Sequence, residues 1–499
     1  MTLVLAGGRI IGTETAVDIV VEHGVIVAIV PAGSAVTNAA MTDAGVTDAA
    51  VTDAADRVEL DGRVVLPGLW DNHVHFTQWA LTSRRLDLST AASADEVVSL
   101  VGERIAAGAT EVVGFGFRDG LWPEPPTAAL LDAVAASVPV VLVSGDLHSV
   151  WLDSAALEQH GFDGHPTGLL REDDAFAVVR ALDDVADDVL DGWAREAASA
   201  AARRGVVGVV DLEMTWNRDV WARRISGGLT GLRVEFGVYR QHLGDAAAAG
   251  LRTGDVVPGS DGLLRVGPFK VITDGSLNTR TAYCFDPYPG LDGDDALGLL
   301  TVAPEELVPL LETARDAGLR PAVHAIGDHA NALALDALET VGVAGSIEHA
   351  QLLSTTDVAR FAPLGITASV QPEHAMDDRD VAERYWAGRT GRAFMLRSLL
   401  DSGATLALGS DAPVAPLDPW VTIAAAVGRS RDGREPWHPE QSITVAEAVA
   451  ASTRSTVEVG EPADLVIVDT DPTTASVDDL RAFPVAATLL AGRFTHRAL

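Results

Sequence analysis

Two kinds of hydrophobic pattern divide the chain. Near the N-terminus, short apolar runs are separated by glycines, as is typical of strands joined by tight turns; they cover residues 3–6, 10–11, 17–21, 25–30 and 57–60. Similar strand signals return near the C-terminus at 463–469 and 487–490. We therefore expect the two ends of the chain to pair into one small β-sandwich.

Between these ends, apolar runs alternate with alanine-rich amphipathic segments. The runs cover residues 112–117, 138–143, 206–210, 232–238, 266–272, 322–323, 366–370 and 406–408, and helical patterns cover 94–107, 193–204, 304–317, 331–340 and 445–452. Alternation of strand and helix over about 350 residues predicts an α/β fold, a (β/α)8 TIM barrel with insertions. We assign residues 1–63 and 451–499 to the β-sandwich and 64–450 to the barrel.

A low-complexity stretch interrupts the N-terminal segment. Five-residue units such as Val46-Thr-Asp-Ala-Ala and Val51-Thr-Asp-Ala-Ala repeat there. A period of five matches neither a helical stripe nor strand alternation. We expect a flexible surface loop over residues 36–56, without catalytic content.

Composition and net charge limit the classes of partner that we expect. The formal net charge of −35 repels phosphate backbones and anionic lipid, so we expect neither nucleic acid nor membrane as partner. No apolar run approaches the roughly 18 residues of a membrane span, and no basic segment precedes the first apolar stretch. Cys284 is the only cysteine, which excludes an internal disulfide and makes the cytoplasm the expected location.

The strongest local motif is the pair His73 and His75, which ends the segment Leu66-Pro-Gly-Leu-Trp-Asp-Asn-His-Val-His. Residues two apart on a strand point to the same face, so both imidazoles can reach one ion. Neutral imidazole is the commonest biological zinc ligand, but a lone His-x-His also occurs in surface and packing roles. The pair alone leaves both interpretations open.

Four more residues stand at or near the ends of apolar runs, just before loops with glycine or proline: Lys270, His324, His349 and Asp411. In a parallel barrel these strand ends converge on one rim, where such folds carry their chemistry. Lys270 is also the single lysine among 36 basic residues. A lysine amine can lose its proton and react, whereas arginine stays charged. The alternative is a free Lys270 in a salt bridge with Asp274 or Asp411 beside a mononuclear site.

These segments resemble family 3 of the amidohydrolase superfamily, the group that includes N-substituted formamide deformylase. The likeness covers nearly the whole chain; its carriers are the segments 67–75, 274–282, 324–328, 347–351, 369–374 and 409–414. Asn72 and Asn278 stand where small residues are expected in relatives.

The resemblance implies a binuclear site, usually zinc. His73, His75 and Asp411 would bind one ion. His324 and His349 would bind the other, and a carbamate on Lys270 would bridge the two ions. An ammonium cannot ligate a cation, whereas a carbamylated lysine presents two anionic oxygens. Metal lowers the pKa of bound water to roughly 7, giving a hydroxide that attacks a carbonyl while Asp411 acts as general base.

We therefore expect a metal-dependent hydrolase that cleaves an amide, N-formyl or N-acyl bond of a small molecule. Esters, lactones and carbamates stay open as substrates. A catalytically inactive ligand-binding barrel is a different class, and it would be expected to have lost a ligand or the base. Substrate-binding candidates are His148, Trp151, Arg280 and His374, although structural roles are common for such residues. The sequence allows a homodimer.

Overall fold

The computed structural model describes residues 2–34, 56–182 and 185–499. The loop predicted at 36–56 lies outside these residues, apart from Asp56, which begins a strand. The described part of the chain contains three β-sheets. They correspond to a barrel, a sheet from the two termini, and a sheet within an insertion.

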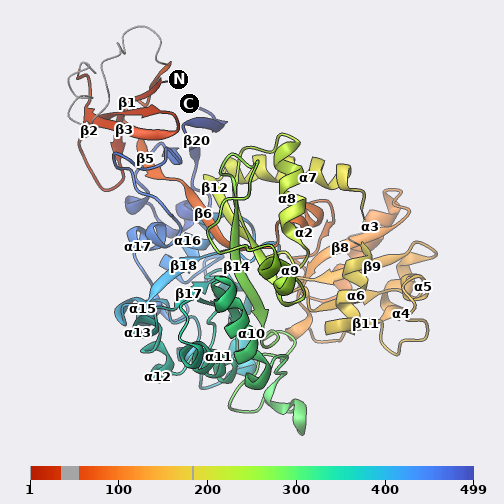
Figure 1. The fold of residues 1–499 in the computed structure, drawn as a ribbon. Helices are drawn as coiled ribbons and strands as arrows, with labels where there is room; N and C mark the ends of the chain where they lie inside the picture. Colours follow the sequence, from red (N-terminus) through yellow and green to blue (C-terminus); the bar gives the residue numbers. More distant parts are fainter. Residues whose placement is uncertain (1, 35–55, 183–184) are drawn as a thin grey trace.

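The terminal strands form one eight-stranded sheet in the order β21-β20-β19-β5-β1-β2-β3, with β4 beside β1. Its strands are β1 (Thr2–Ile10), β2 (Ala16–Glu22), β3 (Val25–Pro31), β4 (Asp56–Glu59), β5 (Val64–Pro67), β19 (Leu465–Val468), β20 (Val485–Leu490) and β21 (Arg493–Arg497). Leu5 and Ile19 from one end share a buried cluster with Leu465 and Leu489 from the other. A separate domain built from both terminal segments is therefore confirmed (Figure 1). The predicted boundary at residue 64 falls at the start of β5, a strand of this sheet.

The barrel is an eight-stranded sheet in the order β18-β17-β16-β15-β14-β13-β12-β6. Its strands are β6 (Leu69–Val74), β12 (Val206–Asp211), β13 (Arg233–Tyr239), β14 (Leu264–Ile272), β15 (Pro321–Ala325), β16 (Ser346–His349), β17 (Thr367–Val370) and β18 (Thr405–Leu408). All neighbours within this order are parallel. The seam closes just beyond β18, where Asp411 N donates to His73 O at 2.7 Å. The predicted barrel is confirmed.

Helices pack around the barrel. Helix α10 (Pro304–Ala317) begins with a proline in its first turn and ends at Gly318 in the left-handed region, and it buries Leu307, Leu311 and Ala314 on one face. The other outer helices are α7 (Asp187–Ala202), α8 (Asn217–Ser226), α9 (Leu243–Ala248), α11 (Asp328–Val341), α12 (Thr355–Val358), α13 (Phe361–Leu364), α14 (His374–Tyr385), α15 (Leu396–Asp401), α16 (Pro419–Gly428), α17 (Val445–Ala451) and α18 (Val477–Arg481). In the described part of the chain, none of the helices has the length and apolar character needed to cross a bilayer.

An insertion follows the first barrel strand, between α2 (Phe76–Thr82) and α7. It contains a sheet in the order β11-β10-β9-β8-β7. Its elements are β7 (Leu86–Asp87), α3 (Ala94–Ala106), β8 (Val112–Phe117), α4 (Ala128–Ala135), β9 (Val140–Ser144), β10 (Ser149–Leu152), α5 (Ser154–Gln159), β11 (Leu169–Arg171) and α6 (Glu172–Leu182). The apolar runs 112–117 and 138–143 therefore do not belong to the barrel, because β8 and β9 pair with each other and bury their side chains against α3 and α4.

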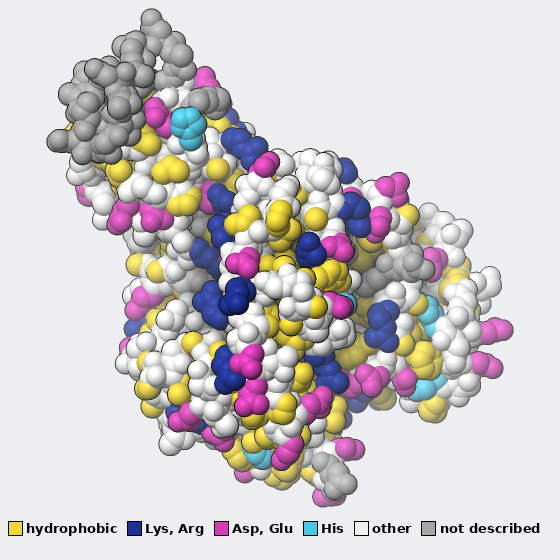
Figure 2. All heavy atoms as spheres, in the orientation of Figure 1, with side chains coloured by type: hydrophobic (Ala, Val, Ile, Leu, Met, Phe, Trp, Pro, Cys, Tyr) yellow, Lys and Arg dark blue, Asp and Glu magenta, His cyan; other side chains and the backbone are white. Residues whose placement is uncertain are grey.

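Acidic side chains are spread over the terminal domain, the barrel and the insertion on the face shown in Figure 2. No single region of this face carries the formal charge of −35. The acidic balance is thus a property of the whole visible surface, and the chemistry of the protein has to be sought in its interior.

Candidate metal centre and active-site cavity

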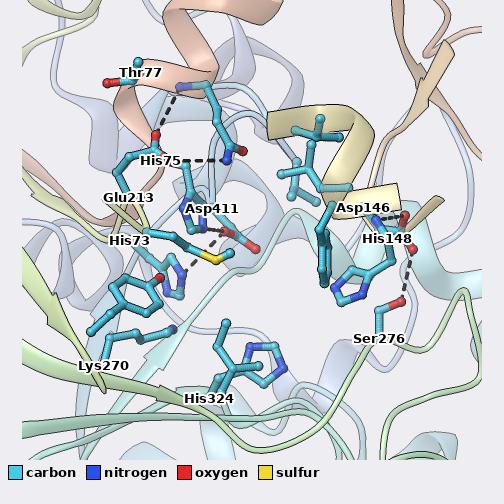
Figure 3. Close-up of a pocket in the computed structure, with 18 of the residues that line it drawn as sticks. His73, His75, Thr77, Asp146, His148, Glu213, Lys270, Ser276, His324 and Asp411 are labelled. Atoms are coloured by element: carbon cyan, nitrogen blue, oxygen red, sulfur yellow. Dashed lines mark hydrogen bonds and ion pairs between the residues drawn. The ribbon is translucent and has the colours of Figure 1, made fainter. Parts of the chain in front are cut away.

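The strand ends of the barrel bring together the six residues singled out in the sequence. His73 lies on β6, Lys270 on β14, His324 on β15 and His349 at the end of β16, while Asp411 follows β18. The parallel register pairs Ile272 with His324 and Ala325 with His349, so neighbouring strands deliver their side chains at similar heights. All six residues line one cavity of about 1080 Å³ (Figure 3).

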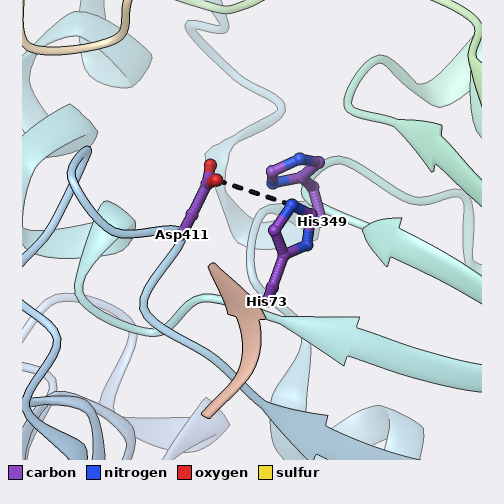
Figure 4. A group of neighbouring side chains, drawn as sticks. All are labelled: His73, His349 and Asp411. Atoms are coloured by element: carbon purple, nitrogen blue, oxygen red, sulfur yellow. Dashed lines mark ion pairs between the residues drawn. The ribbon is translucent and has the colours of Figure 1, made fainter. Parts of the chain in front are cut away.

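Asp411 lies at the centre of this group. Its Oδ1 is 3.5 Å from His73 Nε2 and 3.3 Å from His75 Nε2. One potential ligand atom each from His73, His349 and Asp411 lies within 4.8 Å of the others (Figure 4). The ring centroids of His324 and His349 are 4.4 Å apart, which places His324 beside the same group. These side chains are close enough to share cations.

Unusual backbone geometry aims two of these side chains. His349 has φ of 74° and Asp411 has φ of 59°, in the left-handed region that residues other than glycine rarely adopt. At the end of β16 this turn allows both Glu348 and His349 to reach the site, although neighbours on a regular strand point to opposite faces. Such strain persists only where the surrounding structure enforces it, and it clusters at functional sites.

The barrel seam fixes Asp411. Asp71 Oδ1 accepts hydrogen bonds from Ser410 N at 2.8 Å and from His73 N at 3.2 Å, which ties the loop after β18 to β6. Gly409 is required here, since a Cβ atom would lie 2.8 Å from His73 N. Burial raises the pKa of Asp71 to about 7.

Glu348 is a buried partner of His73 that the sequence did not reveal. His73 Nδ1 lies 2.7 Å from Glu348 Oε2, which leaves His73 Nε2 facing Asp411. Burial alone would raise the pKa of Glu348, but the hydrogen bond from His73 and the charges of His73 and Lys270 lower it to about 2. The ionised carboxylate can only accept a hydrogen bond, so His73 carries its proton on Nδ1 and offers a lone pair at Nε2.

The electrostatics favour neutral His73 and His349 beside ionised carboxylates. Burial, together with the charge of Lys270, lowers the pKa of His73 to about 4. Burial and the neighbouring His324 lower the pKa of His349 well below its ordinary value. Burial would also lower the pKa of His75, but the hydrogen bond and charge of Asp411 raise it. Burial would raise the pKa of Asp411, but the charge of His73 and the hydrogen bond from His75 hold it well below its usual range.

Lys270 is buried without a partner. Its Nζ makes no hydrogen bond and no salt bridge with any described residue, so the alternative pairing with Asp274 or Asp411 is absent from residues 2–34, 56–182 and 185–499. Burial lowers the pKa of Lys270. Asp274 is held instead by Ile326 N and Gly327 N and lies 3.4 Å from His324 Nε2.

The residues fit a divalent metal. Buried polar atoms without a hydrogen bond among the described residues include Lys270 Nζ, His324 Nε2 and His349 Nδ1. Buried groups of this kind are costly unless something satisfies them. Neutral imidazoles and carboxylates are ligands that zinc and similar cations prefer, and here they converge on one point.

Of the four predicted substrate-binding residues, two line the cavity and two do not. His148 and His374 line the cavity, and His374 Nε2 lies 3.8 Å from Asp411 Oδ2. Trp151 does not line it: the side chain is fully buried in the insertion against Phe117 and Trp122. Arg280 does not line it either, because its guanidinium lies over the Tyr385 ring at 5.4 Å. The structure thus places neither Trp151 nor Arg280 on the cavity, and a contact of either with substrate stays a prediction.

Known proteins resemble this chain over most of its length. LONG AFTER FAR-RED 3 of Arabidopsis thaliana is 30% identical over 488 residues, 87% of this chain and 83% of the relative. N-substituted formamide deformylase of Arthrobacter pascens is 27% identical over 88% of this chain and 89% of the relative. An uncharacterised metal-dependent hydrolase from Pyrococcus horikoshii has a similar structure, with a TM-score of 0.76, 25% identity, and coverage of 96% of this chain and 99% of that chain.

The family model described as amidohydrolase family matches residues 56–496. That match includes the barrel, the insertion and the strands of the terminal sheet from β4 onward, and therefore every residue of the candidate centre. The chain belongs to the amidohydrolase family, which makes it a hydrolase and implies a divalent metal ion.

Proposed function

We propose that this protein hydrolyses a carbon–nitrogen bond of a small molecule, an amide, N-formyl or N-acyl bond. The observation that carries the proposal is the convergence of five side chains in one cavity around Lys270, whose Nζ has no hydrogen-bond partner among the described residues. The five are His73, His75, His324, His349 and Asp411. The name of the Arthrobacter pascens relative, N-substituted formamide deformylase, supports an N-acylated amine as substrate.

Two zinc ions are the proposed cofactor. His73 and His75 would hold one ion together with Asp411, His324 and His349 would hold the other, and Lys270 would bridge them. Such ions polarise a carbonyl and lower the pKa of water to roughly 7. The hydrogen bond from His73 Nδ1 to Glu348 keeps His73 Nε2 free for this role.

Lys270 can bridge two cations only after modification, because an ammonium group has no lone pair to offer. We infer that its Nζ adds carbon dioxide: an N–C bond forms, one proton is released, and the product is an anionic carbamate with two oxygens. Burial supports this, since a buried amine with no hydrogen-bonding partner in the described chain is favoured in its neutral, nucleophilic form.

Asp411 is the proposed general base. Its carboxylate lies between His73 and His75 and borders the cavity, so Oδ2 can take a proton from the attacking water. The same oxygen then returns the proton to the departing nitrogen. An amine leaves from a tetrahedral carbon only when protonated, which makes this second transfer necessary for amides.

The test is a panel of N-formyl amines, N-acyl amines, carbamates, lactones and aryl esters, assayed with protein that has been stripped by a chelator and reloaded with zinc or manganese. We expect turnover of N-formyl or N-acyl amines that is lost on stripping and restored on reloading. Turnover confined to esters or lactones would replace the C–N assignment, and turnover that survives complete metal removal would overturn the metal-dependent mechanism.

A further inference from the structure

A closed ring of polar contacts joins the insertion to the barrel at the cavity. Its members are Asp146, His148 and Glu172 from the insertion and Ser276, Thr279 and Thr281 from the loop after β14. Ser276 Oγ donates to Asp146 Oδ2 at 3.0 Å, and Thr281 Oγ1 donates to Glu172 Oε1 at 3.2 Å. Thr279 Oγ1 lies 2.9 Å from Ser276 Oγ and 2.6 Å from Thr281 Oγ1. The insertion is therefore held in place on this side of the cavity.

Backbone strain is concentrated in this ring. Leu147, Glu172 and Arg280 have φ of 66°, 48° and 61°, all in the left-handed region. Leu147 lies between two ring members, Glu172 is one, and Arg280 lies between two others. Because such backbone persists only where surrounding contacts enforce it, the ring is held in one conformation at the cavity.

His148 lines the cavity (Figure 3), as do three other ring members, Asp146, Glu172 and Ser276. Its Nδ1 lies 2.9 Å from Glu172 Oε2, and its ring packs edge-on against Phe176 at 5.6 Å between centroids. A carboxylate can only accept, so Nδ1 carries a hydrogen. The other nitrogen, Nε2, makes no hydrogen bond with any described residue.

The charge state of His148 makes Nε2 a donor. Burial would lower the pKa of His148, but the hydrogen bond and charge of Glu172, with Asp146 beside it and Asp411 across the cavity, raise the pKa to about 9. At neutral pH the ring is an imidazolium that presents an N–H to the cavity. Apolar side chains that line the same cavity include Leu147, Phe176, Val179 and Leu277.

We propose that His148 determines specificity by donating a hydrogen bond from Nε2 to an uncharged carbonyl oxygen in the part of the substrate away from the cleaved bond. This inference rests on the proposed function. Glu172 and Asp146 already balance the charge of His148, so a substrate carboxylate would meet two carboxylates there. The rest of this part of the substrate is apolar, to match Phe176 and Leu277.

The experiment compares matched ligands that differ at one end. The probes are N-formyl alkylamines with three to eight methylene groups that end in a methyl group, a primary amide or a carboxylate. Dissociation constants are measured by calorimetry on zinc-loaded Asp411→Asn protein, in which loss of the proposed base slows cleavage of the probes. The test therefore measures binding and not turnover, so a failed C–N assignment leaves this result readable. We expect the amide series to bind more tightly than the methyl series at a preferred length, and the carboxylate series not to exceed it.

His148→Phe keeps the ring but removes both nitrogens. It should weaken binding of the amide probe by about tenfold to a hundredfold, as for loss of a hydrogen bond to a charged donor, and leave the methyl probe unchanged. His160→Phe is the matched control, because His160 lies in the same insertion but does not line the cavity. Thermal melting verifies that both variants fold, and His148→Gln, which retains an N–H donor, should recover part of the preference if His148→Phe does not fold.

Equal loss of affinity for the amide and methyl probes in His148→Phe would overturn the proposal, because it would indicate a packing role. Tightest binding of the carboxylate series would overturn the assignment of an uncharged acceptor. An unchanged preference for the amide in His148→Phe would exclude His148 as the donor.

Discussion

Two surfaces border the same cavity but satisfy their polar groups in different ways. We call the side chains at the barrel strand ends, such as Lys270, His324 and His349, the rim; we call Asp146, His148 and Glu172 of the insertion the wall. On the rim, Lys270 Nζ, His324 Nε2 and His349 Nδ1 are buried without a hydrogen bond among the described residues. On the wall, Asp146 and Glu172 are saturated by Ser276, Thr281 and His148. The rim is thus complete only with a cation, whereas the wall is organised before any ligand arrives. We therefore expect chemistry and specificity to have separate structural sources.

Asp411→Asn should produce the largest effect, because it removes the proposed base and weakens a candidate ligand on the rim. We expect kcat to fall by about 10²–10⁴-fold, the usual contribution of general acid–base catalysis. Steady-state kinetics of the metal-loaded variant measure kcat, and Asp380→Asn, a change at an exposed residue of α14, is the control. A variant that retains the wild-type kcat would remove Asp411 from the mechanism.

Lys270→Arg should have the second-largest effect, a loss of bound metal. A guanidinium cannot carry a carbamate, so we expect the bound zinc to fall from two equivalents to one or fewer, as measured by elemental analysis. Lys270→Glu is the matched comparison, since a carboxylate can partly replace the bridge. Two full equivalents of zinc in Lys270→Arg would show that Lys270 does not bridge the ions.

Glu348→Gln tests the hydrogen bond that orients His73, one of the proposed metal ligands. An amide oxygen accepts the hydrogen bond from His73 Nδ1 less strongly than a carboxylate, so zinc affinity should fall by about 10- to 100-fold. Competition with a zinc-binding dye gives the affinity directly. Ser346→Ala removes only the hydroxyl that contacts Glu348 and should have the smaller effect; the reverse order would argue against the orienting role of Glu348.

The smallest expected effect is a pH-dependent change in the free energy of unfolding that comes from the His148–Glu172 pair. Because the pKa of His148 is raised from an ordinary value of 6.5 to about 9, its pairing with Glu172 stabilises the fold fully below pH 6.5 and loses that contribution as pH rises through 9. Chemical denaturation should therefore show the stability advantage of wild type over Glu172→Gln shrinking between pH 6.5 and 9. A difference that does not change over this window would contradict the raised pKa.

The rim could be predicted from the sequence because parallel strands deliver their last residues to one edge. Lys270, His324, His349 and Asp411 each follow an apolar run, and the structure places them together with His73. Glu348 was missed for a physical reason: strand alternation points it away from His349, and only the left-handed backbone at His349 brings both to the site.

The wall could not be predicted in the same way. The apolar runs that became β8 and β9 resemble barrel strands, and no periodicity tells which sheet a strand joins. Trp151 lies on β10 and faces Phe117, whereas His148, only three residues earlier, faces the cavity. Which way each side chain points depends on the packing of the insertion, which involves contacts between residues far apart in the chain.

One measurement addresses the shared cation site most directly: anomalous diffraction at the zinc edge from crystals of the zinc-loaded protein. The account predicts two adjacent peaks in contact with His73, His75, His324, His349 and Asp411, with additional density extending from Lys270 Nζ between them. Peaks that lie away from these side chains in an active preparation would contradict it.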